Sequence, residues 1–250
     1  MILGVDTGGT FTDFVLLSSV KEDESKEGVR LTTHKVLSTP EAPERAILQG
    51  ITEMGLAEDI SAGLVKIIHG STVATNAALE GKGVKTAFVT NTGFRDLLTI
   101  GRQTRPFLYR LDTPPINPPV PRELCLEVGG RIDSKGHVLE SLDADSLADL
   151  VTTLNTHAPE AIAVSLLFSF LAPEQERHIA EYLNAHLEFS PFISLSSDVL
   201  PEYREYERSI ATWLNASLGP LVSDYLLKLK SGTHPSRLSI MQSSGGTIDA

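Results

Sequence analysis

The first hundred residues alternate between short apolar runs and segments with the spacing of an amphipathic helix. The runs are short and bounded by glycine or polar residues, which is typical of strands. Predicted strands cover residues 1–6, 13–19, 29–37, 64–70 and 84–91, a charged hairpin tip covers 21–28, and predicted helices cover 39–55, 71–81 and 92–101. Three consecutive strands followed by strand–helix alternation predict an α/β fold whose mixed sheet has an antiparallel part and flanking helices.

The pattern changes after residue 101. Residues 102–125 carry six prolines and little periodicity, so we expect an ordered surface excursion rather than a helix or a central strand. The later predicted elements are a hairpin of 126–133 and 137–142, strands at 161–170 and 192–197, and helices at 143–158, 172–187 and 201–230. In the last helix, Gly219–Pro220 should produce a kink or a break, and Glu205 and Arg208 should form an exposed intrahelical pair.

Charge and composition narrow the class of protein. The chain has 250 residues and a formal net charge of −11. This acidic balance disfavours nucleic acid and anionic membranes as partners, because both carry negative charge. No apolar run approaches the ~18 residues that would span a bilayer, and no signal peptide is evident at the N-terminus. A cytoplasmic location is therefore expected.

The single cysteine, Cys125, excludes an intramolecular disulfide. Its residue type and apolar surroundings favour a small buried side chain. A catalytic thiol is the alternative.

The stretch GVDTGGTFTD, from Gly4 to Asp13, combines glycine, threonine and aspartate directly after an apolar strand. Gly8 and Gly9 tolerate positive φ, so such a turn can direct several backbone N–H groups at one phosphate. Its three hydroxyls (Thr7, Thr10 and Thr12) are further donors, while Asp6 and Asp13 are oxygen ligands of the kind that magnesium prefers.

Two nucleotide-binding motifs are excluded for this turn. A strand rather than a helix follows it, unlike a dinucleotide-binding fingerprint, and no Lys-Ser or Lys-Thr pair closes it as in a Walker A loop. The remaining alternatives are a plain hairpin turn and a site for Mg-nucleotide phosphates.

The turn resembles the phosphate-1 motif of the hydantoinase A/oxoprolinase family, a branch of the actin-like ATPase superfamily with ribonuclease-H-like lobes. The resembling stretches occur in the same order as in the family and together cover nearly the whole chain. Within the family, the turn is more similar to that of N-methylhydantoinase and hydantoin-utilisation A proteins than to that of 5-oxoprolinases. It is carried by the stretches at residues 4–15, 35–51, 67–106, 200–220 and 241–248.

The resemblance implies an ATP-dependent hydrolase that opens cyclic amides such as hydantoins, 5-oxoproline or lactams, with ATP and Mg²⁺ as cofactors. Phosphorylation of the amide oxygen would make an unreactive amide susceptible to attack by water. By similarity, Asp6 would position magnesium, directly or through water, and the backbone of residues 7–10 would cradle phosphate. Thr10 and Thr12 would be secondary donors, and Asp13 would orient the turn.

Further candidate residues lie in the second resembling stretch. His69, Ser71, Thr72 and Asn76 surround a predicted strand end and helix start, where an anion could bind. Packing of His69 and capping by Ser71 or Asn76 are the alternatives. Arg102 could clamp a carboxylate or phosphate, or pair at the surface. These five are the candidate substrate-binding residues, and no catalytic residue is identified.

The resemblance also implies a domain boundary. Residues 1–236 correspond to the family's N-terminal region, and 237–250 to the start of a second, hydantoinase A lobe whose own phosphate turn is not found here. We therefore expect the 250 residues alone to bind nucleotide weakly and to be inactive, and the full-length form to be a homo-oligomer, with a second hydrolase subunit as a partner. The alternatives are a non-catalytic binding module and a sugar kinase of the actin-like superfamily.

Overall fold

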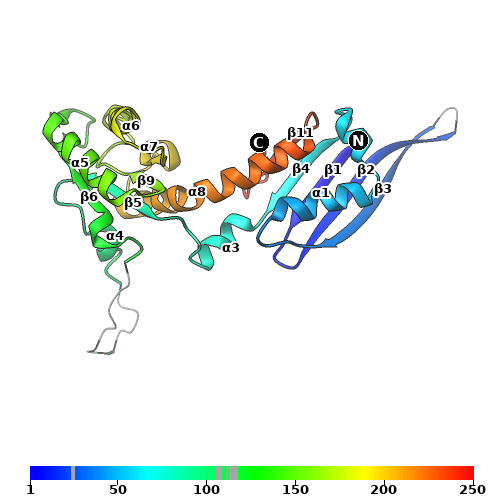
Figure 1. Ribbon diagram of the computed structural model, residues 1–250, viewed down its shortest axis with the longest axis horizontal. Helices are drawn as coiled ribbons and strands as arrows, with labels where there is room; N and C mark the ends of the chain where they lie inside the picture. The colour runs from blue at the N-terminus through cyan, green and yellow to red at the C-terminus, as the bar shows by residue number, and fades with distance from the viewer. Residues whose placement is uncertain (24–25, 105–108, 111, 113–117) are drawn as a thin grey trace. The chain divides into compact units, whose positions relative to one another are not determined.

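The computed structural model describes residues 1–23, 26–104, 109–110, 112 and 118–250 (Figure 1). The chain forms two compact units. Unit 1 comprises residues 1–82 and 221–250, and unit 2 comprises residues 83–220. None of the helices in the described ranges is both long enough and apolar enough to cross a membrane.

Unit 1 is built on a six-stranded mixed sheet. In spatial order its strands are β12 (Thr247–Asp249), β11 (Arg237–Met241), β4 (Lys66–Ser71), β1 (Ile2–Thr7), β2 (Phe11–Asp23) and β3 (Lys26–Leu37). Strands β1, β2 and β3 are antiparallel neighbours, whereas β1, β4 and β11 run parallel. The predicted mixed sheet is therefore confirmed, and the carboxyl ends of three parallel strands meet at one edge.

Helices cover one face of this sheet. The helices of unit 1 are α1 (Pro43–Glu53), α2 (Ala57–Ser61), α3 (Val73–Leu79) and the C-terminal part of α8 (Glu205–Thr233). Helix α1 lies along strands β1–β3 (Figure 1) and buries Ala46, Ile47 and Ile51, as the spacing predicts. On β2, Phe14 is buried in this core, while its neighbour Val15 faces outward and is 40% exposed. This alternation is expected for a strand with one covered face.

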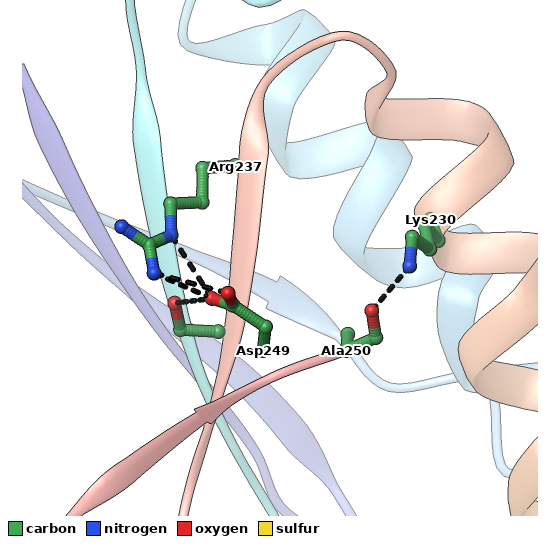
Figure 2. Close-up of polar contacts among 5 residues, drawn as sticks. Lys230, Arg237, Asp249 and Ala250 are labelled. Atoms are coloured by element: carbon green, nitrogen blue, oxygen red, sulfur yellow. Dashed lines mark hydrogen bonds and ion pairs between the residues drawn. The ribbon is translucent and has the colours of Figure 1, made fainter.

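The C-terminal hairpin completes the sheet of unit 1. Figure 2 shows the Arg237 guanidinium paired with the Asp249 carboxylate, with N–O distances of 2.9 and 3.0 Å, and the Lys230 ammonium bonded to the carbonyl of Ala250. These contacts tie β11, β12 and α8 together. Residues 237–249 thus extend the sheet that carries β1, and their assignment to the start of a second lobe stays a prediction.

Unit 2 contains a four-stranded parallel sheet in the order β10 (Phe192–Leu195), β9 (Ala161–Val164), β5 (Thr86–Asn91) and β6 (Cys125–Val128). All residues of β5 and β9 are buried, as is usual for central parallel strands. The remaining elements are α4 (Leu97–Ile100), a 3₁₀ turn (Arg122–Leu124), β7 (Arg131–Ile132), β8 (Val138–Glu140), α5 (Ala144–His157), α6 (Glu174–His186), α7 (Ser196–Val199) and the N-terminal part of α8.

Several predicted elements differ from the structure. The hairpin predicted from 126–133 and 137–142 is shorter, because residues 125–128 pair with β5 and only β7 and β8 form the hairpin. The charged tip predicted at 21–28 is largely strand, since β2 reaches Asp23 and β3 begins at Lys26; residues 24 and 25 lie outside the described residues. Of the kink or break expected at Gly219–Pro220, the break is absent: α8 continues through Pro220, although the division between the units falls there.

Part of the proline-rich excursion predicted at 102–125 lies outside the described residues. Its described end forms the 3₁₀ turn and enters β6 at Cys125. The strand predicted at 161–170 ends at Val164, and turns follow.

The buried position predicted for Cys125 is confirmed, with 3% of the residue exposed. Burial raises the pKa of its thiol to about 11. Because only the thiolate reacts, we expect iodoacetamide to alkylate the native protein at pH 8 at least ~100-fold more slowly than a free thiol. Mass spectrometry of timed samples measures this rate, with the urea-unfolded chain as the control. Equal rates for native and unfolded protein would contradict the expectation.

Candidate functional site

The turn between β1 and β2 brings Gly8, Gly9 and Thr10 to the edge where the parallel strands end. The Gly8 N–H donates to the Phe11 carbonyl at 3.0 Å. A Cβ on Gly8 would lie 3.2 Å from that oxygen, so a larger residue here would push the Phe11 carbonyl by a few tenths of an ångström. Neither glycine has a positive φ, which differs from the reason expected from sequence. Gly9 and Thr10 are exposed, and their N–H groups bond to none of the described residues.

Ser38, the residue that follows β3, stabilises this turn by hydrogen bonds. Its N–H donates to the Thr10 carbonyl at 2.9 Å, and its hydroxyl donates to the Gly8 carbonyl at 2.8 Å. The Thr12 hydroxyl, which is fully buried, lies 3.0 Å from the same Ser38 oxygen. Thr12 therefore supports the turn from inside. Sequence analysis missed Ser38, although the pairing of the strands at Phe11 and Leu37 places the next residue beside the turn.

Asp6 and Asp13 lie directly opposite each other on β1 and β2. Asp13 pairs with Lys35 at 3.0 Å, whereas the exposed Asp6 carboxylate makes no hydrogen bond or ion pair with any described residue. Two carboxylates in directly opposed positions repel each other, and a cation would relieve this repulsion. The described residues contain no group of three acidic, histidine or cysteine ligands. The two carboxylates alone do not make a metal site. They would suit magnesium only together with phosphate, because that ion commonly takes one or two carboxylates and fills its shell with phosphate oxygens and water.

The end of β4 and the start of α3 lie beside the turn and supply three of the candidate residues. The Thr72 hydroxyl donates to the Thr7 carbonyl at 3.2 Å and accepts from the Asn76 amide at 3.3 Å. Ser71 pairs with Thr7 across the strands, and its hydroxyl accepts from the Val73 N–H at 3.1 Å. The structure thus brings Ser71, Thr72 and Asn76 together with the turn.

His69 lies on the covered face of the same strand and is completely buried. Its Nδ1 lies 3.2 Å from the Val5 carbonyl, and its Nε2 is bonded to the Tyr225 hydroxyl. Both ring nitrogens are therefore occupied by protein groups. Burial lowers the pKa of His69, and the nearby Asp6 carboxylate offsets this in part.

Arg102 belongs to unit 2, unlike the other candidate residues. Its Nε donates to the Glu207 carboxylate at 2.8 Å, and its guanidinium lies 5.8 Å from the centre of the Tyr206 ring. The hydrogen bond from Arg102 is the main reason that the pKa of Glu207 is lowered. The arginine is thus engaged in a surface ion pair.

The chain is similar in sequence to known proteins over nearly its whole length. The chain is 32% identical to the caprolactamase subunit alpha of Pseudomonas jessenii over 98% of its own length and 35% of that subunit. It is 28% identical to the 5-oxoprolinase of Saccharomyces cerevisiae, over 99% of its own length and 22% of the relative. The chain therefore spans between a fifth and about a third of these relatives.

Two solved structures share the fold. The crystal structure of the ATP-dependent caprolactamase from Pseudomonas jessenii superimposes with a TM-score of 0.79 and 30% identity, over 99% of this chain and 36% of that one. A nucleotide-free acetone carboxylase superimposes with a TM-score of 0.80 over 100% of this chain and 37% of that one, at 24% identity, which supports the fold alone. These likenesses agree with the actin-like lobe expected from sequence.

Residues 2–187 match the family described as the hydantoinase/oxoprolinase N-terminal region. The match covers most of the chain and includes both the turn after β1 and the end of β4. It favours the resemblance identified from sequence over the sugar-kinase alternative. The chain belongs to the hydantoinase/oxoprolinase family and carries its N-terminal region.

Proposed function

We propose that the turn between Asp6 and Asp13 binds the phosphates of Mg-ATP, and that the chain is the nucleotide-binding region of an enzyme that opens cyclic amides. The observation that carries the proposal is the combination of exposed N–H groups at Gly9 and Thr10 with an unpaired Asp6 carboxylate at one strand edge. Such N–H groups bind phosphate oxygens without a lysine. The carboxylates suit magnesium bound jointly with phosphates.

The relatives support the choice of substrate class. They are named caprolactamase and 5-oxoprolinase, and the solved caprolactamase is described as ATP-dependent. An amide is a poor electrophile, so ATP would serve to activate its oxygen before water attacks. Magnesium would offset charge on the phosphates during that transfer. In this chain, Asp6 and Asp13 would hold the ion, and Ser38 and Thr12 would hold the turn.

The remaining candidate residues have supporting roles in this proposal. Ser71, Thr72 and Asn76 line the strand edge beside the turn and would contact the outer part of the bound anion or the substrate. Arg102 would have to leave Glu207 to do so. A second hydrolase subunit is the proposed partner, since the caprolactamase relative is itself named as one subunit. The homo-oligomer and the cytoplasmic location stay predictions.

Calorimetric titration of the purified chain with Mg-ATP tests the phosphate site. We expect weak but saturable binding that is lost when EDTA removes magnesium. Asp6→Ala should weaken it at least ~10-fold, because the free carboxylate no longer binds the ion. Asp145→Ala, which removes an exposed carboxylate in the first turn of α5 in unit 2, is the matched control. Equal affinity of the Asp6→Ala and Asp145→Ala variants would contradict the site.

The activity is tested on the protein as its source produces it. ATP hydrolysis is measured with and without hydantoin, 5-oxoproline and caprolactam. The proposal expects ATP hydrolysis that depends on one of these rings. ATP hydrolysis at the same rate with and without each cyclic amide would contradict the proposed substrate class. It would not contradict the phosphate site.

One observation favours a second candidate function, a non-catalytic binding module. Five apolar side chains on the uncovered face of the unit 1 sheet are each more than a third exposed, and three of them (Ile2, Leu17 and Leu31) occupy directly paired positions. They are Ile2, Val15, Leu17, Val29 and Leu31. An apolar patch of this kind is typical of a protein-interaction surface. Failure of the wild-type chain to bind Mg-ATP would make this second function the better one.

A further inference from the structure

A buried polar cluster lies under the strand edge that carries the phosphate turn. It consists of Thr7 on β1, His69 on β4 and Tyr225 on α8, all in unit 1. None of the three is more than 5% exposed. Polar groups in such a position are costly unless they are hydrogen-bonded, so the arrangement of their donors and acceptors is closely constrained.

The protonation of His69 follows from its partners. Nδ1 lies 3.2 Å from the Val5 carbonyl, and because a carbonyl can only accept, Nδ1 carries the hydrogen. Burial lowers the pKa of the ring and favours its neutral form. Nε2 is then an acceptor, and the Tyr225 hydroxyl must donate to it. The two rings meet edge to face, with centres 5.7 Å apart and planes at 70°.

The Tyr225 hydroxyl contacts both strands of the edge. Burial raises the pKa of this phenol, and the hydroxyls of Ser71 and Thr7 oppose that rise in part because they can donate toward the phenol oxygen. The buried Thr7 hydroxyl makes no hydrogen bond that meets ordinary geometry with any described residue, so the Tyr225 oxygen is a contact rather than a formed hydrogen bond. One side chain of α8 therefore reaches β4 through His69 and Ser71, and β1 through Thr7.

These contacts hold the backbone on both sides of Asp6, the candidate magnesium ligand. Val5, whose carbonyl receives the His69 hydrogen bond, precedes Asp6 in the chain, and Thr7 follows it. The carbonyl of Thr7 is in turn held by Thr72. A shift of Tyr225 would thus be transmitted to the backbone on both sides of Asp6.

We propose that Tyr225 is a positioning residue for the phosphate turn: through its hydrogen bond to His69 and its contact with Thr7, it fixes the backbone that presents Asp6 and the N–H groups of Gly9 and Thr10. This inference rests on the proposed function, namely that the turn binds Mg-ATP. Tyr225 itself touches no ligand. His69 accordingly supports the turn from the protein interior and does not contact the substrate.

Removal of the phenol oxygen in Tyr225→Phe tests the inference with little change in shape. The variant leaves His69 Nε2 without its donor, and we expect Mg-ATP to bind about five- to tenfold more weakly to the full chain. Tyr182→Phe is the matched control, because Tyr182 lies on α6 in unit 2 and stacks on His186. Its affinity should equal that of the wild type.

A spectroscopic measurement separates positioning from loss of structure. In ¹⁵N spectra of the wild-type chain labelled at histidine, the His69 ring should show a protonated Nδ1 and an unprotonated Nε2. Both signals should shift when Mg-ATP is added, because the cluster contacts the backbone of the turn. His186, which stacks on Tyr182, should not respond. This measurement stays decisive if Tyr225→Phe proves too unstable to titrate.

The outcomes distinguish the two proposals. A wild-type chain that fails to bind Mg-ATP would overturn the proposed function and this inference with it. Wild-type binding with equal affinity of Tyr225→Phe, or His69 ring signals that ignore Mg-ATP, would overturn the positioning role alone. Weaker binding by Tyr225→Phe, together with a His69 response in the wild type, is the expected result.

Discussion

Replacing Arg208 with alanine should destabilise the protein by about 3–5 kcal/mol, because the change leaves buried hydrogen-bond acceptors unpaired and removes the positive charge that offsets the buried Glu176 carboxylate. Arg208 and Glu176 are both fully buried in unit 2. The Glu176 carboxylate contributes favourably to the charged state of Arg208, although burial lowers the pKa of the arginine overall. A lone buried charge is among the few features that give a single substitution so large an effect.

The two charges persist in the interior because the Ser196 hydroxyl links them and nearly every polar atom of both side chains has a partner. Glu176 accepts from Leu166 N–H at 2.8 Å, from the Ser196 hydroxyl at 2.6 Å and from Ser197 N–H at 2.8 Å. The Arg208 guanidinium donates to the carbonyls of Leu166 and Glu202, at 2.9 and 2.7 Å, and to the Ser196 hydroxyl at 3.2 Å. This network joins α6, α7 and α8 to the turns after β9.

Chemical denaturation measures the free energy of unfolding of Arg208→Ala. Arg177→Ala, which removes an exposed arginine next to Glu176 on α6, is the control and should change stability by less than about 0.5 kcal/mol. A double-mutant cycle of Arg208→Met and Glu176→Gln then isolates the coupling. If Arg208→Ala proved no more destabilising than Arg177→Ala, the charge pair would be energetically unimportant.

Arg208 also shows why sequence predicts some contacts wrongly. Helical spacing suggested an exposed pair of Glu205 with Arg208, and this is wrong, because the guanidinium is buried among carbonyls, Ser196 and Glu176. Helical spacing identifies neighbours within one helix only. The partners of Arg208 on α6 and α7 are brought close by tertiary folding, which spacing along α8 cannot show.

A similar limit explains the strand predicted at 161–170. Its residues are apolar except for Ser165 and Ser169, but β9 ends at Val164 because side chains from other elements hydrogen-bond to the backbone groups that follow. Glu176 takes the N–H of Leu166, and the Asn91 amide oxygen takes that of Leu167 at 2.7 Å. Apolar content alone cannot distinguish a buried turn from a buried strand.

The phosphate turn was easier to predict because its signal is local. The strand end, the glycine pair, the hydroxyls and the carboxylates all lie within residues 4–13, and the succession of strands predicts a mixed sheet with an antiparallel part. Its supports were not predictable in the same way. Tyr225 and Ser38 reach the site from α8 and from the end of β3, and no local motif marks either of them.

Gly50→Ala gives the second large effect, and here sequence and structure predict opposite signs. Gly50 lies inside α1, where alanine is favoured over glycine by about 1 kcal/mol on helix propensity. In the folded chain, however, a Cβ at this position would lie 2.2 Å from Cζ of Phe14 and within 2.8 Å of two other ring carbons. Phe14 is 1% exposed and held in the core between α1 and the sheet.

We expect Gly50→Ala to destabilise the protein by about 2–3 kcal/mol, since overpacking of a closed core costs more than the helix gains. Chemical denaturation measures the loss, and Arg45→Ala, at an exposed position of the same helix, is the control. Phe14→Leu should be destabilising alone but should relieve the clash, so the double variant should lose less than the sum of the two. A Gly50→Ala protein as stable as the wild type would show that α1 can move off β2, and the close helix–sheet contact behind Asp13 would then not be rigid.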